Sequence, residues 1–154
     1  MIKIKFISIL LFVSILSNAA LAQNAEDIIK YRMNIMKALG NHISIIAANL
    51  KGKVSMPEDI LPHSKSMLLT LSAINIDKLF PENTAPNDIL KTKALDTIWS
   101  EKELFKKTLI DSIDKTKILV LAAESGINQD IAKGLGSLGK TCGSCHDKFR
   151  KKKN

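Results

Sequence analysis

Cysteine and aromatic residues are scarce in this chain of 154 residues. It holds two cysteines, both in one short motif, together with one tryptophan and one tyrosine. A disulfide between cysteines so close together would close a very small loop and stabilise little, which argues against a disulfide-dependent scaffold. The shortage of tyrosine and tryptophan argues against nucleic-acid binding, even though the chain carries a formal net charge of +8.

Recognisable catalytic groups are also lacking in the sequence. It shows no nucleophile paired with a base, no phosphate-binding glycine loop and no pair of carboxylates at a characteristic spacing. The sequence therefore predicts a protein that is not an enzyme.

The first 22 residues have the pattern of a secretory signal peptide. A short basic start precedes an apolar run over 6–16, and Ala20-Leu21-Ala22 has the form of a cleavage site. The alternative is an uncleaved membrane anchor, but the run is shorter than the roughly 20 residues that a spanning helix needs. We therefore expect cleavage after Ala22, export to the periplasm, and a mature domain of residues 23–154.

Four stretches of the mature chain show apolar residues at the three- and four-residue spacing of an amphipathic helix. The expected helices cover about 25–50, 55–74, 100–125 and 128–154, and no stretch shows a strand pattern. A long connection over 76–98 contains prolines and asparagines and is expected to hold at most a short helical turn.

The ends of these helices carry further signals. Ser55 with Glu58, and Ser100 with Glu103, have the spacing of capping boxes at the starts of the second and third helices. Gly126 suits the end of the third helix. The connections between the first and second predicted helices, and between the third and fourth, are short, which favours antiparallel neighbours. We therefore predict an all-α, antiparallel four-helix bundle with a cofactor site between facing helices.

Two of the predicted helices carry a regular apolar stripe. The glycines that interrupt the last helix are poor helix formers, which we interpret as making space for a bulky group close to the backbone. They are Gly134, Gly136 and Gly139. The stripe of the first helix consists of Ile29, Met33, Met36, Gly40, Ile43, Ala47 and Leu50, and that of the last consists of Ile131, Leu135, Leu138, Cys142, Cys145 and Phe149.

Both cysteines belong to the motif Cys142-Gly143-Ser144-Cys145-His146, which is the attachment signature of a c-type haem. Two thiols one helical turn apart can form thioethers with one haem, and His146 would then be an axial ligand of the iron. A zinc site needs about four ligands, and no second pair of cysteines or histidines follows. A redox dithiol is a further alternative, but a thioredoxin-like setting expects a strand before the motif.

On these motifs the chain resembles class II cytochrome c, the cytochrome c′ family, over nearly all of its mature length. The opening 26–32, the Lys51-Gly52-Lys53 segment, the Ile98-Trp99-Ser100 segment and the haem-binding end 142–150 each resemble a part of the family pattern. The resemblance implies a four-helix bundle that carries one haem c through Cys142 and Cys145, with His146 as the proximal ligand.

The resemblance also implies roles for two arginines. Arg150 corresponds to a basic residue beside the proximal face of the haem, where it can influence ligand exchange. Arg32 corresponds to an arginine near a haem propionate. The alternatives are a solvated terminal arginine for Arg150 and an exposed helix charge for Arg32.

The sixth position of the iron decides the function. Met36 corresponds to the family position that faces the distal side of the haem, where the side chain either ligates the iron or blocks it, and Met33 is a second candidate. A methionine–histidine pair raises the reduction potential and suits electron transfer. A five-coordinate iron would instead bind nitric oxide or carbon monoxide. His42 and His63 are expected at the surface, away from the haem.

We therefore expect a periplasmic mono-haem cytochrome that transfers one electron at a time, with gas sequestration or sensing as the alternative. A thiol oxidoreductase without haem is a third hypothesis. Loss of Lys3 and Lys5 with the signal peptide leaves a net charge of +6. The basic cluster at 148–153 is either a solvated helix end or a docking patch for an acidic redox partner. The resemblance further implies a possible homodimer through the first helix.

Overall fold

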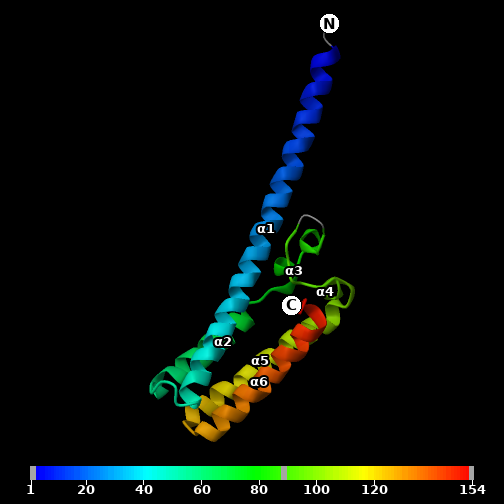
Figure 1. Cartoon of the computed structure of the whole chain (residues 1–154). Helices are drawn as coiled ribbons and strands as arrows, with labels where there is room; N and C mark the ends of the chain where they lie inside the picture. The colour runs from blue at the N-terminus through cyan, green and yellow to red at the C-terminus, as the bar shows by residue number, and fades with distance from the viewer. Residues whose placement is uncertain (1–2, 88–89, 153–154) are drawn as a thin grey trace.

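The computed structural model describes residues 3–87 and 90–152, with side chains described from residue 24 onward. The described residues contain helices and no strand, apart from one isolated bridge between Ala94 and Arg150. The elements are α1 (Lys3–Leu50), η1 (Pro57–Asp59), α2 (Ile60–Ser72), α3 (Ile76–Leu79), η2 (Glu82–Thr84), α4 (Thr97–Ser100), α5 (Lys102–Ser125) and α6 (Asn128–Phe149) (Figure 1).

The four long helices form the bundle that the sequence predicts. Helix α5 runs along α6, α2 packs on α5, and α1 packs on α2 (Figure 1). Helix α1 touches α6 at only a few places, so the bundle is loosest between these two helices. Over the residues described, none of the helices is long and apolar enough to span a membrane.

Most helix boundaries agree with the sequence, but the start of the first helix does not. Helix α1 begins at Lys3 and runs without a break through the predicted cleavage point after Ala22, whereas the sequence placed its start near Ala25. Helix α5 ends at Gly126, whose φ of 70° is in the left-handed region that favours glycine. The connection over 76–98 holds the short helical turns α3 and η2.

The prediction of two capping boxes was wrong. The residues at the starts of η1 and α5 are Met56 and Glu101, and neither side chain caps its helix. The Met56 amide instead donates to Asn49 Oδ1 at 2.8 Å, which ties the start of η1 to the end of α1. The serine–glutamate spacing was present, but η1 and α5 each begin one residue later than the boxes require.

The apolar core has two large parts and a third, small cluster formed by Ala25, Ile29 and Leu90. The larger lies between the four helices and is built mainly from leucine and isoleucine, each of which contributes roughly 1.5–3 kcal/mol when fully buried. The smaller lies where the connection between α2 and α5 meets α5 and α6. Its rings make edge-to-face contacts, with the ring centroid of Phe105 at 4.9 Å from that of Phe80 and 5.0 Å from that of Phe149. The larger part contains Leu39, Ile46, Ile60, Met67, Leu71, Leu119, Ala123, Ile131 and Leu138.

The buried side of α1 follows the predicted stripe in part. Ile29 is buried, and Ile43 and Leu50 pack against the core, as the stripe predicts. Between them Arg32, Leu39 and Ile46 are buried in place of the predicted Met33, Gly40 and Ala47. The stripe was wrong at these positions because the pattern treated Arg32 as a surface charge, whereas the fold buries it.

One of the three glycines of α6 serves a different purpose from the one predicted. A Cβ atom on Gly134 would lie 3.2 Å from the Leu119 Cα, so this glycine lets α5 and α6 approach closely. A Cβ atom on Gly136 or Gly139 would meet no atom of the described chain within 4 Å. Close helix packing at Gly134, rather than space for a bulky group at all three positions, is what the structure shows.

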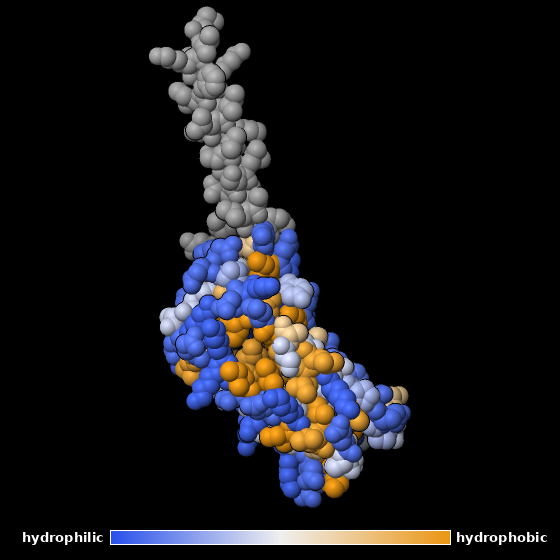
Figure 2. Space-filling view, turned by 180° about the vertical axis from the view of Figure 1, so that it is seen from behind, coloured by the Kyte–Doolittle hydropathy of each residue, from blue (hydrophilic) through white to orange (hydrophobic). Residues whose placement is uncertain are grey.

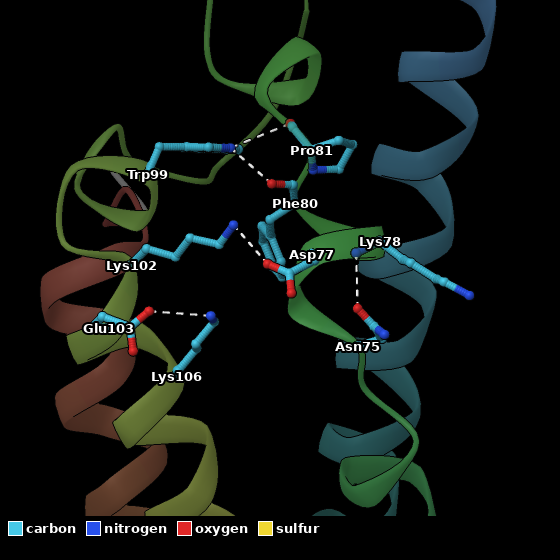
Figure 3. Close-up of polar contacts among 9 residues, drawn as sticks. All are labelled: Asn75, Asp77, Lys78, Phe80, Pro81, Trp99, Lys102, Glu103 and Lys106. Carbon is cyan, nitrogen blue, oxygen red and sulfur yellow. Dashed lines mark hydrogen bonds and ion pairs between the residues drawn. The ribbon is translucent and has the colours of Figure 1, made fainter.

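The connection between α2 and α5 is fastened to the top of the bundle. The Trp99 indole N–H donates to the Phe80 carbonyl at 3.0 Å and to the Pro81 carbonyl at 3.3 Å. Below it, Lys102 pairs with Asp77 at 2.7 Å (Figure 3). These contacts hold the short helix α3 against α5 and place the Phe80 ring at the edge of the functional site.

Candidate functional site

The haem motif occupies the last two turns of α6 and faces inward. Cys142, Cys145 and His146 are all half-buried. Cys142 packs against the larger core and Cys145 against the smaller aromatic part. The two thiols therefore lie where the predicted stripe of the last helix put them, along the seam between α6 and its neighbours, and the imidazole of His146 is half-buried next to Cys145.

A cavity of about 430 Å³ opens beside this motif, where α1 and α6 are least tightly packed. It lies within the size range of cofactor sites, roughly 300–1,000 Å³. Figure 2 shows one face of the molecule on which hydrophobic side chains gather in a hollowed area framed by hydrophilic ones. The cavity is lined by Arg32, Met33, Met36, Lys37, Phe80, Thr92, Lys93, Ala94, Ile98, Phe105, Cys145, His146, Phe149 and Arg150.

The polar part of the lining is basic. Arg32, Lys37, Lys93 and Arg150 contribute four cationic side chains, and none of the described lining residues is an aspartate or glutamate. An apolar cavity with a cationic rim favours a flat hydrophobic ligand that carries negative groups. A haem with its two propionates has this character, so the residues present fit the group that the motif implies.

Arg32 is buried rather than solvated, with only 4% of its surface exposed. Its Nη1 donates to Thr84 Oγ1 at 2.9 Å and to the Leu79 carbonyl at 3.4 Å. Its Nη2 donates to Thr92 Oγ1 at 2.8 Å and to the Thr84 carbonyl at 3.2 Å. The guanidinium also lies 4.8 Å from the centre of the Phe80 ring. The alternative of an exposed helix charge was therefore wrong.

The buried guanidinium of Arg32 has only neutral hydrogen-bond acceptors. Burial lowers its pKa from 12.5 to about 10, which still leaves the group charged at neutral pH. A buried cation that no carboxylate balances raises the potential of the cavity wall. Arg32 thus both fastens the connection to α1 and favours an anionic group in the cavity.

The charge state of His146 suits a metal ligand. Burial lowers the pKa of its imidazole, and the nearby Arg150 guanidinium lowers it further, while Asp147 acts in the opposite direction. The ring is therefore neutral at neutral pH, which is the form that binds iron. Arg150 itself is exposed, and its backbone N–H donates to the His146 carbonyl at 3.1 Å.

The thiols have the opposite character from those of a redox dithiol. Burial raises the pKa of both Cys142 and Cys145, and the Thr108 hydroxyl lies 3.5 Å from the Cys145 sulfur. Dithiol oxidoreductases instead need a thiol with a lowered pKa, because the thiolate is the nucleophile. The environment of the motif therefore favours covalent attachment over thiol exchange.

The methionines of α1 face the motif from the other side of the cavity. Met36 and Met33 both line it and keep 40% and 41% of their surface exposed. The structure thus brings the predicted residues Arg32, Met36, Cys145, His146 and Arg150 to one cavity, with Cys142 one turn behind on the core side of α6.

The two remaining histidines lie outside this cavity, as expected, but they are half-buried rather than fully exposed. The Nδ1 atoms of His42 on α1 and His63 on α2 are 2.8 Å apart. Packing of α2 onto α1 brings them together, and a separation of 21 positions in the chain gave no reason to pair them.

The wall formed by residues 92–95 was not foreseen from the sequence. The end of α6 is bonded to it, because Leu95 N–H donates to the Phe149 carbonyl at 3.0 Å and Lys151 N–H donates to the Lys93 carbonyl at 2.8 Å. Thr92 and Lys93 thereby reach the cavity. Hydrogen bonds of this kind leave no periodic signal in the sequence, so no pattern could have indicated them.

Comparison with known proteins agrees with this site. Residues 27–150 match the family model described as cytochrome c′. A cytochrome c′ of Pararhodospirillum photometricum is 33% identical over 125 residues, which are 81% of this chain and 97% of the relative. The fold of this chain is similar to that of a solved cytochrome c′ from Rhodobacter Spheriodes, with a TM-score of 0.77 and 24% identity. The similarity covers 84% of this chain and 98% of the other.

A second solved structure is similar at 25% identity and a TM-score of 0.72, covering 84% of this chain and 97% of the other. It is the nitric oxide complex of the L16A mutant of cytochrome c prime from Alcaligenes xylosoxidans. That protein therefore binds a diatomic gas within the same fold.

Proposed function

This chain belongs to the cytochrome c′ family and carries haem c on Cys142 and Cys145, and we propose that it transfers single electrons in the periplasm. When bound, the haem supplies an iron that changes between two oxidation states one electron apart. The chain's own residues hold that group, set the charge around it and control what reaches it.

One observation carries this proposal: Met36 and His146 line the same cavity from opposite helices. His146 is the proposed proximal ligand, held on α6 one residue after the Cys145 thioether. Met36 offers a thioether sulfur from α1, and a methionine–histidine pair favours the reduced iron and a high potential. Met33, three positions before Met36 and about one helical turn away on α1, is the alternative donor.

The cationic rim supports an acidic redox partner. Lys37, Lys93 and Arg150 line the cavity, and the basic residues at the end of α6 extend the charge. Long-range attraction would speed encounter with a negative surface and weaken as salt screens it. Docking at this rim would bring the partner to the exposed side of the cofactor cavity.

A potentiometric titration of the mature protein tests the proposal, together with electron-exchange rates measured against ionic strength. We expect one reversible one-electron step. We also expect exchange with an acidic partner protein to slow with added salt, and Lys93→Glu to slow it at low salt. A protein that cannot be reduced and reoxidised reversibly would contradict electron transfer, whereas rates independent of salt would contradict only the docking rim.

Gas binding is the second candidate. It is supported by Met36, which lines the cavity and keeps 40% of its surface exposed, and by the nitric oxide complex of the Alcaligenes protein. In that case Met36 and Met33 would shape a pocket for nitric oxide or carbon monoxide rather than ligate the iron. Purely five-coordinate ferric iron that takes up nitric oxide would favour this function.

The location and assembly of the protein belong to the same proposal. Residues 1–22 would be removed as a signal peptide, leaving α1 to start near Gln23. Tyr31, with 62% of its surface exposed, and Met33 lie on α1 where a second copy could cover them. Analytical ultracentrifugation of the mature protein would test the homodimer, and a sedimentation coefficient typical of a monomer at all concentrations would contradict it.

A further inference from the structure

The contact between His42 and His63 is not explained by the haem site. The rings lie on α1 and α2, with centroids 5.0 Å apart and planes inclined by 47°, and neither residue lines the cofactor cavity. A pair of leucines would fill the same helix contact without a half-buried polar group. The imidazole pair instead places two ring nitrogens, one from each helix, at the same point of the contact.

We propose that His42 and His63 form a second metal site, which binds a divalent transition-metal ion between α1 and α2. The two Nδ1 atoms are 2.8 Å apart, so an ion about 2.05 Å from each would see them about 86° apart. In the metal-free protein one Nδ1 carries the proton that the other accepts. The ion replaces that shared proton, and both rings turn so that their Nδ1 lone pairs converge on it beside the line that joins the two nitrogens.

The angle selects the metal. Cis ligands near 90° are those of a square-planar or tetragonal ion, which copper(II) and nickel(II) prefer. A tetrahedral zinc ion would need the two nitrogens about 3.3 Å apart. Imidazole is a good ligand for copper, and copper(II) stands highest among the divalent ions in affinity for a given nitrogen site. Copper(II) is therefore the ion that we expect this pair of imidazoles to bind most tightly.

The remaining ligands come from solvent. No third histidine, cysteine, aspartate or glutamate joins the pair in the part of the chain that the structure describes. Both rings are half-buried, so water can complete the coordination of an ion bound at their outer edge. Burial and the neighbouring His63 also lower the pKa of His42, which keeps its ring in the neutral, ligating form. A site with two protein ligands and open positions exchanges its metal readily.

The composition of the chain makes this proposal easy to test. It contains three histidines, and the third is His146, the proposed haem ligand. In the haem-loaded protein, any copper signal from two imidazole nitrogens must therefore come from His42 and His63. The readout is independent of electron transfer or gas binding, so the two functions are tested separately.

The experiment is a titration of the mature haem-loaded protein with copper(II) sulfate, followed by calorimetry and by electron paramagnetic resonance of the copper. We expect one ion per chain, nitrogen couplings from two imidazoles, and a melting temperature that rises with copper. His42→Gln and His63→Gln should each weaken binding at least tenfold and leave one coupled imidazole.

Lys65→Gln, on the same helix as His63 and exposed, is the matched control and should bind copper like the unaltered protein. The haem absorption and helical circular dichroism of each variant show that it folds. Absence of a one-to-one copper complex in the unaltered protein would overturn the proposal. Copper affinity in His42→Gln or His63→Gln equal to that of the unaltered protein, with the variant correctly folded, would overturn it as well.

Discussion

Arg32 on α1 donates from Nη2 to the Thr92 hydroxyl at 2.8 Å, which joins residues 60 positions apart in the chain. Through this bond and those to Thr84 and Leu79, one buried side chain organises the connection that closes the top of the bundle. The same guanidinium lines the haem cavity. The stability of the connection and the charge of the site therefore depend on one residue.

Arg32→Leu should destabilise the protein by about 2–4 kcal/mol, because it leaves buried oxygens of Thr84 and Leu79 without their donor. Thr92→Val removes one acceptor and should cost only about 1 kcal/mol. Chemical denaturation of the haem-loaded protein measures both. Equal stability of Arg32→Leu and the unaltered protein would contradict the role assigned to this arginine.

The close approach of α5 and α6 predicts opposite effects of one substitution at two glycines. Gly134→Ala places a Cβ atom 3.2 Å from the Leu119 Cα and should destabilise by about 1–3 kcal/mol. Gly136→Ala meets open space and should stabilise by up to about 1 kcal/mol, since alanine is the better helix former. Thermal unfolding compares the pair, and the same sign at both positions would refute the packing account.

The ion pair between Asp77 and Lys102 predicts a dependence of stability on acid pH. The hydrogen bond and charge of Lys102 hold the pKa of Asp77 below its ordinary value of 3.8. The stabilisation is thus present above pH 3.8 and is lost as the pH falls through the lower pKa of the folded protein. Both side chains are well exposed, so the effect is small.

Asp77→Asn isolates this contribution. The melting temperature of this variant should be lower than that of the unaltered protein at pH 7. The difference should vanish as the pH falls below the pKa of the Asp77 carboxyl in the folded protein. Glu103→Gln is a suitable comparison, because Glu103 pairs with Lys106 on the same helix and does not touch α3 (Figure 3). A difference that persists unchanged at pH 2 would exclude the ion pair as its cause.

Covalent attachment through Cys142 and Cys145 predicts how firmly the haem is held when the thiols are removed. In Cys142→Ala one thioether should still hold the haem. In the double variant Cys142→Ala with Cys145→Ala, extraction with acid and organic solvent should remove the haem and its colour. A pyridine haemochrome spectrum before and after extraction measures this. Haem that resists extraction in the double variant would show that the covalent bonds lie elsewhere.

The sequence predicted the last helix better than the first. In α6 the stripe from Ile131 to Phe149 contains only apolar residues and cysteines, so pattern and burial coincide. In α1 the buried side includes Arg32, whose burial depends on acceptors in a connection 50 to 60 residues away. No local pattern carries that information, so the predicted stripe included Met33, Gly40 and Ala47 in place of the buried Arg32, Leu39 and Ile46.

The site shows the same division. Cys142, Cys145 and His146 were identified from their spacing, because the chemistry of attachment requires adjacent positions on one helix. Thr92 and Lys93 were not, since they reach the cavity through backbone bonds to the end of α6. The His42–His63 contact was missed for a similar reason: it results from helix packing, and neither residue has a neighbour in sequence that predicts it.

Ligation of the iron by Met36 is tested most directly by electron paramagnetic resonance of the ferric mature protein, compared with its Met36→Ala and Met33→Ala variants. With Met36 opposite His146 in the same cavity, the unaltered protein and Met33→Ala should show low-spin iron, and Met36→Ala should show high-spin iron. Purely high-spin iron in the unaltered protein would contradict methionine ligation and point to the gas-binding function.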